Sequence, residues 1–157
     1  EFISGLCNDY PALSQQIVLG FDESGWLQQP TDFIKYCEQL RALGFKLMLT
    51  DVGNGLCSMN VFQLPLWHEV SLAANLVAEI EQHDHKRNLC ASIIRIFANQ
   101  HVEITATELT TEMQAYLLHV MGVKNGSGPV QGLTVPANQV LDLVKTENLL
   151  VADAPAL

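Results

Sequence analysis

LRALGFKLMLTDVGNG (residues 40–55) is the stretch of sequence that decides the fold. It opens on the end of a segment with helical period, residues 30–44, whose final glycine fits the C-terminal stop of a helix. Residues 45–51 then form a short, mostly apolar run that is typical of a buried strand. Gly53 and Gly55 mark a turn directly after that run. A helix, a strand and a glycine turn in this order predict one unit of a parallel β/α sheet.

The same alternation of apolar runs and helical segments extends along the chain. Strands are expected at residues 16–21, 45–51, 69–73, 101–106 and 130–134, and helices at residues 30–44, 58–64, 75–82, 89–97, 110–121 and 138–145. This alternation predicts an α/β fold with a parallel sheet, whose right-handed crossovers place the helices outside it. A complete eight-stranded β/α barrel takes about 200 residues or more. With 157 residues, the chain is expected to form a TIM-barrel-like sheet that is an incomplete or modified barrel.

Three local signals refine these expectations. Thr31 or Asp32 is expected to cap the helix at residues 30–44. The polar run at residues 83–87 is expected to separate two helices. Residues 124–128, which include two glycines, are expected to form a flexible loop.

The composition describes one acidic domain. The chain carries 17 Asp and Glu residues against 8 Lys and Arg, which gives a formal net charge of −9. A surface of this sign repels phosphate backbones and anionic lipid, so no nucleic-acid or membrane-surface binding is expected, whereas a basic protein partner is compatible with it. Hydrophobic residues make up 48% of the chain, which is enough for a sizeable core. We assign residues 1–146 to one domain and residues 147–157 to an acidic tail.

The cysteines and the apolar runs indicate the cellular compartment in which the protein is expected. Cys7, Cys37, Cys57 and Cys90 are widely scattered and form no CxxC pair, so reduced thiols in a cytoplasmic protein are expected. No apolar run approaches the ~20 residues that span a bilayer. The opening residues also lack the basic and apolar regions of a signal peptide.

Five motifs occur in a fixed order along the chain. They are IVLGFDES (17–24), the stretch at 40–55, LP (64–65), ATELTTEMQ (106–114) and VQG (130–132). Together they resemble the EAL family of cyclic di-GMP phosphodiesterases, whose patterns include L-E-L-x-x-T-E-S, D-D-F-G-T-G and A-E-G-V-E-T-x-x-Q. The resemblance implies a TIM-barrel-like fold. The family's E-A-L strand and its asparagine-bearing strand would precede Glu1, so the chain corresponds to the C-terminal portion of such a domain.

The resemblance also implies a reaction, metal-assisted phosphodiester hydrolysis, which needs several carboxylates around Mg²⁺ or Mn²⁺. The family's acidic ligand positions correspond here to Gly20, Thr50, Ala73 and Thr107, and one carboxylate remains at Asp51. Because a lone carboxylate binds Mg²⁺ weakly, we expect no catalytic residues, no bound metal or other cofactor, and no hydrolysis. The resemblance therefore predicts a degenerate EAL-like domain that is not an enzyme.

Some positions of the family pattern are kept. Glu23 matches a loop-supporting glutamate, and Gln131 matches the glutamine near the end of the domain. With Asp51, Gly53 and Gly55 they form the vestigial pocket that the resemblance implies. Asp51 is expected to cap or orient the glycine turn, and the alternative is that this turn cradles a phosphate.

Small shifts in the alignment leave alternatives open. The family's lysine falls at Val70 or Ser71. Asp22 lies on the same strand face as the first lost ligand and is the one candidate for a substitute. A weak phosphodiesterase that uses Asp22, Asp51 and Glu108 in altered roles is therefore the third functional hypothesis.

The first hypothesis is a catalytically inactive regulatory module that acts through protein–protein interaction. By resemblance, its partner would be a transcriptional regulator or a motility or secretion regulator. Trp26 and Trp67 would then be partner anchors, or else core residues. The second hypothesis is a non-catalytic cyclic di-GMP receptor, although the lost ligand positions mean that cyclic di-GMP is not expected to bind. A homodimer is compatible with an open sheet edge and with the helix after Cys57.

His83 and His85 flank Asp84, which raises the question of a metal site. A solvated helix junction is the expected structure of this polar run.

Overall fold

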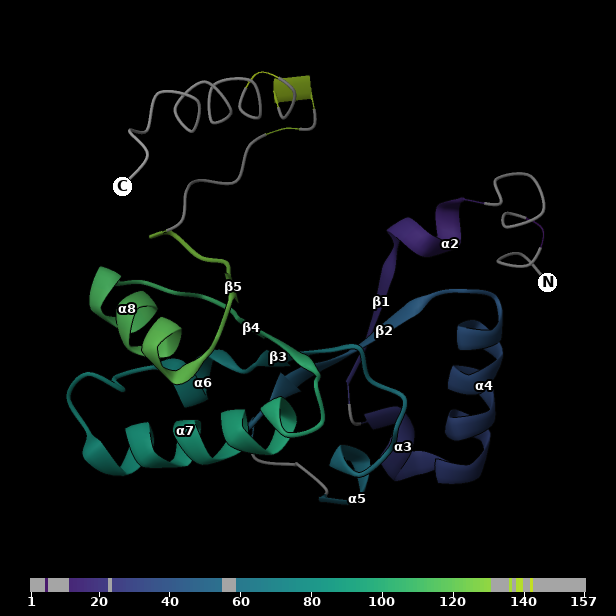
Figure 1. Ribbon diagram of the computed structural model, residues 1–157, viewed down its shortest axis with the longest axis horizontal. Coiled ribbons are helices and arrows are strands. Elements are labelled where there is room, and N and C mark those ends of the chain that lie inside the picture. Colours follow the sequence, from purple (N-terminus) through teal and green to yellow (C-terminus); the bar gives the residue numbers. More distant parts are fainter. Residues whose placement is uncertain are drawn as a thin grey trace.

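The strands form one parallel sheet (Figure 1). The computed structural model of the chain describes residues 5, 12–22, 24–54, 59–130, 136, 138–139 and 142. In chain order the strands are β1 (Val18–Phe21), β2 (Lys46–Val52), β3 (Glu69–Leu72), β4 (Glu103–Ala106) and β5 (Asn125–Gly126). Each strand pairs in parallel with the next one along the chain. This sequential order is that of a β/α barrel, and it confirms the predicted TIM-barrel-like sheet.

The sheet is open within the described residues, because β1 and β5 lie at its two ends. Helix α2 (Leu13–Gln16) precedes β1, and the connections between strands contain α3 (Ser24–Gln28), α4 (Pro30–Ala42), α5 (Met59–Phe62), α6 (Ala74–Val77), α7 (Asp84–Ala98) and α8 (Glu112–Met121). An open sheet with helices packed outside it is the incomplete barrel that was expected. None of the described helices is long and apolar enough to cross a membrane.

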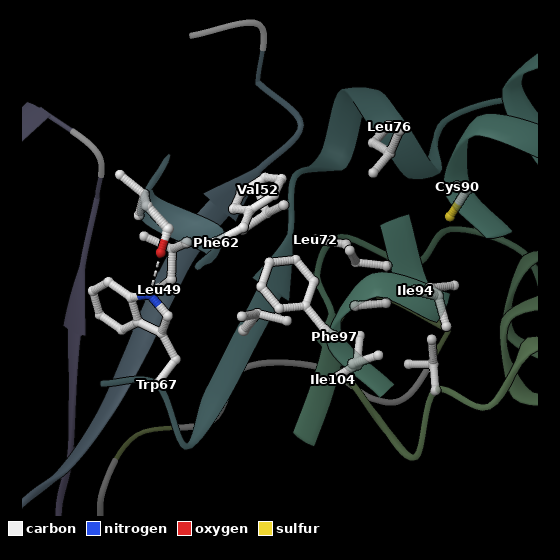
Figure 2. Close-up of a cluster of buried hydrophobic side chains, with 14 of the residues drawn as sticks. Leu49, Val52, Phe62, Trp67, Leu72, Leu76, Cys90, Ile94, Phe97 and Ile104 are labelled. Atoms are coloured by element: carbon white, nitrogen blue, oxygen red, sulfur yellow. Dashed lines mark hydrogen bonds between the residues drawn. The ribbon is translucent and has the colours of Figure 1, made fainter. Parts of the chain in front are cut away.

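The core lies between the sheet and these helices (Figure 2). Side chains point alternately to the two faces of a strand, so Leu47 and Leu49 of β2 share one face, and both are fully buried on the helix side of the sheet. Phe97 of α7 is also fully buried, and its ring lies 4.9 Å from that of Phe62. Trp67 is 7% exposed and donates its indole N–H to the Val61 carbonyl at 2.9 Å. Trp67 is therefore a core residue and not a partner anchor.

The helix at residues 30–44 was predicted with the right position and the wrong cap. α4 begins at Pro30, and its N-cap residue is Gln29, which makes no side-chain capping bond. Proline at the first helical position has no N–H to satisfy, so the helix starts there and not after Thr31 or Asp32. Gly44 follows the helix with φ +94°, the left-handed conformation that ends helices, as expected.

Two other elements differ from the sequence-based prediction. The polar run at residues 83–87 does not separate helices, because α7 begins at Asp84 and contains most of it. The preceding helix is shorter than predicted, since the chain leaves the helical region at Ala78 and Glu79 has φ +61°. Residues 124–128 are not simply a loop, because Asn125 and Gly126 pair with β4.

The predicted strand at 130–134 and the predicted helix at 138–145 lie almost wholly outside the described residues.

Candidate functional site

The carboxyl ends of the strands meet at one edge of the sheet, where β/α barrels bind their ligands. β1 and β2 run in register, with Gly20 beside Met48. A Cβ atom on Gly20 would lie 2.9 Å from the Thr50 Cγ2 methyl. Two of the positions that the family resemblance assigns to acidic ligands are therefore neighbours, and the Thr50 methyl fills the space in which a side chain at position 20 would begin.

Asp51 lies at an irregular point of β2, where the pairing with β3 shifts register. Its backbone has φ +56°, and its N–H donates to the Ser71 hydroxyl at 3.3 Å. Its carbonyl accepts from the Asn54 N–H at 3.2 Å, while its side chain is exposed. The backbone of Asp51 therefore forms part of the turn.

Gly53 completes this turn with φ +96°. A Cβ atom there would lie 2.9 Å from Leu76 Cδ2 of α6. Both the left-handed backbone and the close approach of α6 require glycine, so packing accounts for this position without a bound phosphate.

The other two substituted positions tie the strand ends together. Ala73 is buried, and its N–H donates to the Val52 carbonyl at 2.9 Å. The Thr107 hydroxyl donates to the Leu72 carbonyl at 2.9 Å. At both positions the side chain offers a cation no charged oxygen.

A divalent cation of the Mg²⁺ or Mn²⁺ type does not fit this donor set. Such ions prefer several carboxylate oxygens, and of the positions that the family resemblance assigns to acidic ligands, Asp51 carries a carboxylate whereas Gly20, Thr50, Ala73 and Thr107 do not. Among the residues that the structure describes, no group of three or more His, Cys, Asp or Glu side chains could hold a metal ion. Asp22 is described and interacts with another group, whereas Glu23, Gly55 and Gln131 of the predicted pocket lie outside the described residues.

A separate cleft of about 430 Å³ opens between the α6–α7 connection and the start of α8. Its described lining residues are Ala74, Asn75, Ala78, Glu79, Glu81, Gln82, Glu108, Thr110, Thr111 and Gln114. These lining residues include three glutamates, Glu79, Glu81 and Glu108, and no lysine or arginine.

The wall of this cleft at α8 is a capping box. The Thr111 hydroxyl accepts from the Gln114 N–H at 3.1 Å, and the Gln114 side-chain oxygen accepts from the Thr111 N–H at 3.2 Å. The Thr111 hydroxyl also donates to a carboxylate oxygen of Glu81 at 3.1 Å. These bonds fix Glu81 beside the positive end of the α8 dipole.

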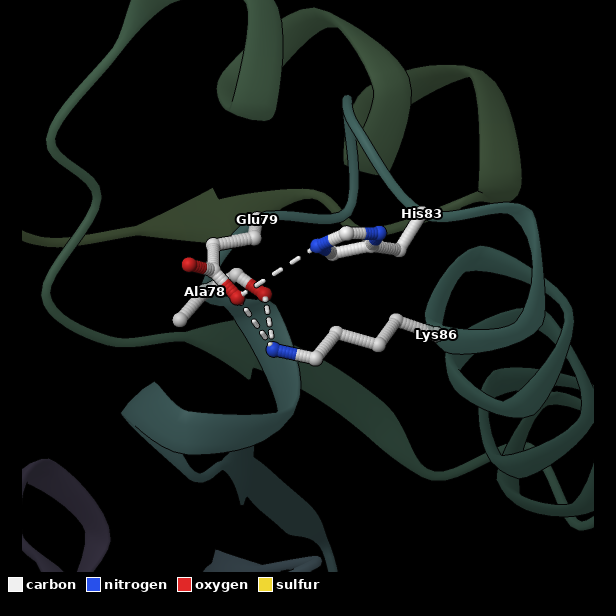
Figure 3. A network of polar contacts seen from close by, with 4 residues as sticks. All are labelled: Ala78, Glu79, His83 and Lys86. Carbon is white, nitrogen blue, oxygen red and sulfur yellow. Dashed lines mark hydrogen bonds and ion pairs between the residues drawn. The ribbon is translucent and has the colours of Figure 1, made fainter.

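The opposite wall is held by an ion-pair network (Figure 3). Lys86 donates from Nζ to Glu79 Oε2 at 2.7 Å and to the Ala78 carbonyl at 3.4 Å. His83 Nε2 lies 3.8 Å from the same carboxylate oxygen. The hydrogen bond and the charge of Lys86 lower the pKa of Glu79. Glu79 is therefore paired with Lys86, and this network holds the segment between α6 and α7 against the start of α7.

The polar run behaves as a helix start at the surface. Arg87 donates to the carbonyls of Ile80 at 3.0 Å and Glu81 at 3.4 Å, which secures the same connection. The His83 and His85 rings are exposed and lie 5.5 Å apart. The start of the run is exposed to solvent as expected, although it begins α7 and is not a junction between two helices.

Burial shifts the pKa of Cys37, Cys90 and His68, which lie away from the carboxyl ends of the strands. Burial raises the pKa of the Cys37 and Cys90 thiols to about 11, so both are unreactive near neutral pH. His68 accepts the Leu47 N–H at Nδ1, at 3.2 Å. Burial, with the positive charges of two nearby basic side chains, lowers the pKa of His68 and keeps it neutral.

The EAL domain family model matches residues 1–132. The chain belongs to the EAL domain family. Among solved structures, the PaMucR phosphodiesterase in its c-di-GMP complex matches with a TM-score of 0.78 at 21% identity, over 88% of this chain and 56% of that one. The EAL domain of DcpA from Mycobacterium smegmatis matches with a TM-score of 0.83 at 16% identity, over 92% of this chain and 65% of that one.

BlrP1 from Klebsiella pneumoniae, in a manganese and cy-diGMP complex, matches with a TM-score of 0.73 at 21% identity, over 80% of this chain and 33% of that one. This EAL chain thus spans between a third and two thirds of the length of these three structures. At such identities the likeness shows the fold alone. No curated protein matches the chain.

The acidic cleft was missed by sequence reasoning, although part of its signal is readable. Thr111 followed by Gln114 is the spacing of a capping box, which predicts the helix start and the buried amide. The approach of Glu81 to Thr111 joins residues 30 positions apart, and no local pattern predicts it.

Proposed function

We propose that this EAL domain is a catalytically inactive regulatory module that works by binding another protein. The contact between Gly20 and Thr50 is the observation that supports the proposal most. The family pattern implies carboxylates at both positions. Here one residue has no side chain and the other places a methyl group in the space between them.

The remaining ligand positions support the same proposal. Ala73 is buried and apolar, and the Thr107 hydroxyl is engaged with the Leu72 carbonyl. Hydrolysis of a phosphodiester by this family's route would need an ion held by several charged oxygens, to activate water and to offset charge in the transition state. Asp51 alone supplies too little negative charge to hold such an ion, so no step of hydrolysis is assigned to it.

The proposed partner is a basic protein, because the chain carries a net charge of −9. A transcriptional regulator, or a regulator of motility or secretion, is the class that we propose. The matched structures include a phosphodiesterase bound to c-di-GMP, so loss of turnover and loss of nucleotide binding need separate tests.

The catalytic arm of the test incubates the chain with cyclic di-GMP and Mn²⁺ and separates the products by chromatography. We expect no linear dinucleotide above the protein-free blank, and the same result for Asp51→Ala. Linear product made by the parent chain and lost in Asp51→Ala would overturn the proposal.

The binding arm has two measurements. Calorimetry with cyclic di-GMP, with and without Mg²⁺, is expected to give no heat up to high micromolar ligand, and a saturable signal would favour a receptor instead. Affinity capture from the source cells is expected to retain a specific partner, and recovery of none would count against a regulatory module.

A further inference from the structure

We propose that the cleft beside the N-terminus of α8 binds a basic peptide segment of the partner protein. This inference rests on the proposed function, because it assigns the surface through which that function operates. The cleft borders the carboxyl ends of β3 and β4, because its lining residues Ala74 and Glu108 directly follow Ala73 and Thr107, although none of Gly20, Thr50, Asp51, Ala73 and Thr107 itself lines it. Its volume of about 430 Å³ falls within the range of ~300–1,000 Å³ that is typical of ligand pockets.

The carboxylates of the cleft are not equally available. Glu79 is paired with Lys86 at 2.7 Å. Among the described residues, the Glu81 carboxylate accepts the Thr111 hydroxyl and has no ion pair, while Arg87, which is outside the lining, donates to the Glu81 backbone carbonyl at 3.4 Å. Glu108 is exposed and has no ion pair to any described residue. Glu81 and Glu108 therefore leave two negative charges in the lining without a basic neighbour there.

Gln114 provides an independent sign of a ligand. Its side chain is 5% exposed, and its amide oxygen accepts from the Thr110 N–H at 2.9 Å, the Thr110 hydroxyl at 3.0 Å and the Thr111 N–H at 3.2 Å. Because the two backbone N–H groups require an oxygen, the orientation of the amide is fixed and its NH₂ group must point elsewhere. Among the described residues that NH₂ group has no acceptor, which is uncommon for a buried donor.

These two features define the chemistry of the occupant. Carboxylates bind cationic groups, and a buried NH₂ donor needs a carbonyl or a similar oxygen. A bare metal ion would leave the amide donor unsatisfied, and an anionic lipid or nucleic acid would be repelled by Glu81 and Glu108. A peptide with an arginine or lysine supplies both groups, because its backbone carbonyl can accept from Gln114. The methyl groups of Ala74 and Ala78 can cover the aliphatic stem of the basic residue.

The test uses the full chain and a short synthetic peptide of alternating arginine and glycine, with a glutamine-for-arginine peptide as the uncharged comparison. The cleft variant carries Glu81→Gln and Glu108→Gln, which keep the side-chain size and the oxygen acceptors. The matched control carries Glu38→Gln and Glu103→Gln, which change the net charge equally at exposed positions outside the cleft lining.

Fluorescence anisotropy is expected to show that the cleft variant binds the arginine peptide at least about tenfold more weakly, while the control loses less than about twofold. In ¹H–¹⁵N spectra the side-chain NH₂ signals of Gln114, assigned by their absence in Gln114→Glu, are expected to shift on binding. Gln114→Glu keeps the capping-box oxygen, so the helix start is preserved.

Equal losses in the cleft variant and the control would mean that the peptide senses only the overall charge, and the cleft would be excluded as the site. Unmoved Gln114 signals at saturating peptide would exclude it as well. Either result leaves the proposed function standing if a partner is captured, whereas turnover of cyclic di-GMP would remove the proposed function without affecting the peptide measurements.

Discussion

Alanine at position 20 should be tolerated only when the methyl group of Thr50 is removed. The added Cβ would meet Thr50 Cγ2 at 2.9 Å, which is closer than real Cβ contacts. Threonine is branched at Cβ and stiff at χ1, so it cannot move aside without leaving its preferred rotamer. Gly20 lies within β1, where its backbone conformation does not itself forbid alanine.

The magnitudes follow from two opposing effects. Overpacking lowers the free energy of unfolding by about 1–3 kcal/mol, and replacing a strand glycine by alanine raises it by about 0.5–1 kcal/mol. Gly20→Ala should therefore lower the free energy of unfolding by about 1 kcal/mol in the parent chain. In Thr50→Ser, which keeps the hydroxyl and loses the methyl, the same change should raise the free energy of unfolding by about 0.5–1 kcal/mol.

The assay is urea unfolding of four proteins: the parent, each single variant and the double variant. The coupling energy between the two positions is expected to be about 1–3 kcal/mol, with unchanged m-values. If Gly20→Ala has the same effect in both backgrounds, the two positions do not touch, and the argument that these substitutions jointly close the ligand site fails.

Three other perturbations test the core, the helix start and the histidine. In urea unfolding, Phe97→Ala should lower the free energy of unfolding by about 3–5 kcal/mol, whereas Leu89→Ala on the exposed face of α7 should change it by less than about 0.5 kcal/mol. Similar values for the two variants would contradict the placement of Phe97 in the core. Thr111→Ala should cost about 1 kcal/mol by thermal unfolding and Thr111→Ser much less, and an equal loss would contradict the capping role. His68 has its pKa lowered below 6.5, so its contribution to stability is complete above pH 6.5 and is lost as the pH falls through the lowered value. His68→Gln should therefore flatten the fall in urea midpoint on acidification, and an unchanged pH profile would refute this.

The fold was readable from the sequence wherever a pattern was local. Residues 45–51 are an apolar run that became β2, and the glycine at position 44 ended α4 as expected. β5 was missed because two residues, Asn125 and Gly126, carry no strand pattern and pair only because β4 lies beside them. The length of α6 was missed because Glu79 adopts a left-handed backbone that glutamate rarely takes.

The site was readable in one respect only. The sequence predicts which side chains stand at the family's carboxylate positions, because that comparison needs only the order of residues. It does not reveal that the Thr50 methyl occupies the space next to Gly20, since the two belong to different strands. The acidic cleft was not predicted from the sequence for the same reason, because Glu81 and Gln114 come from separate segments of the chain.

The proposed loss of ligand carboxylates need not weaken the sheet, because the side chains on the two faces of a strand have different surroundings. In β2, Leu47 and Leu49 are fully buried against the helices, while Lys46, Met48 and Thr50 alternate with them on the other face and stay partly or largely exposed. The residues that stabilise the barrel scaffold are therefore not the residues that would hold an ion. Substitutions on the inner face can end metal-dependent chemistry while the core keeps its packing, so an EAL domain can retain its fold without its reaction. The loops at α6 and α8 are held in place by the same scaffold, because Arg87 of α7 donates to the Ile80 carbonyl and Thr111 at the start of α8 donates to Glu81. A partner that binds these loops would therefore not need the ligand carboxylates.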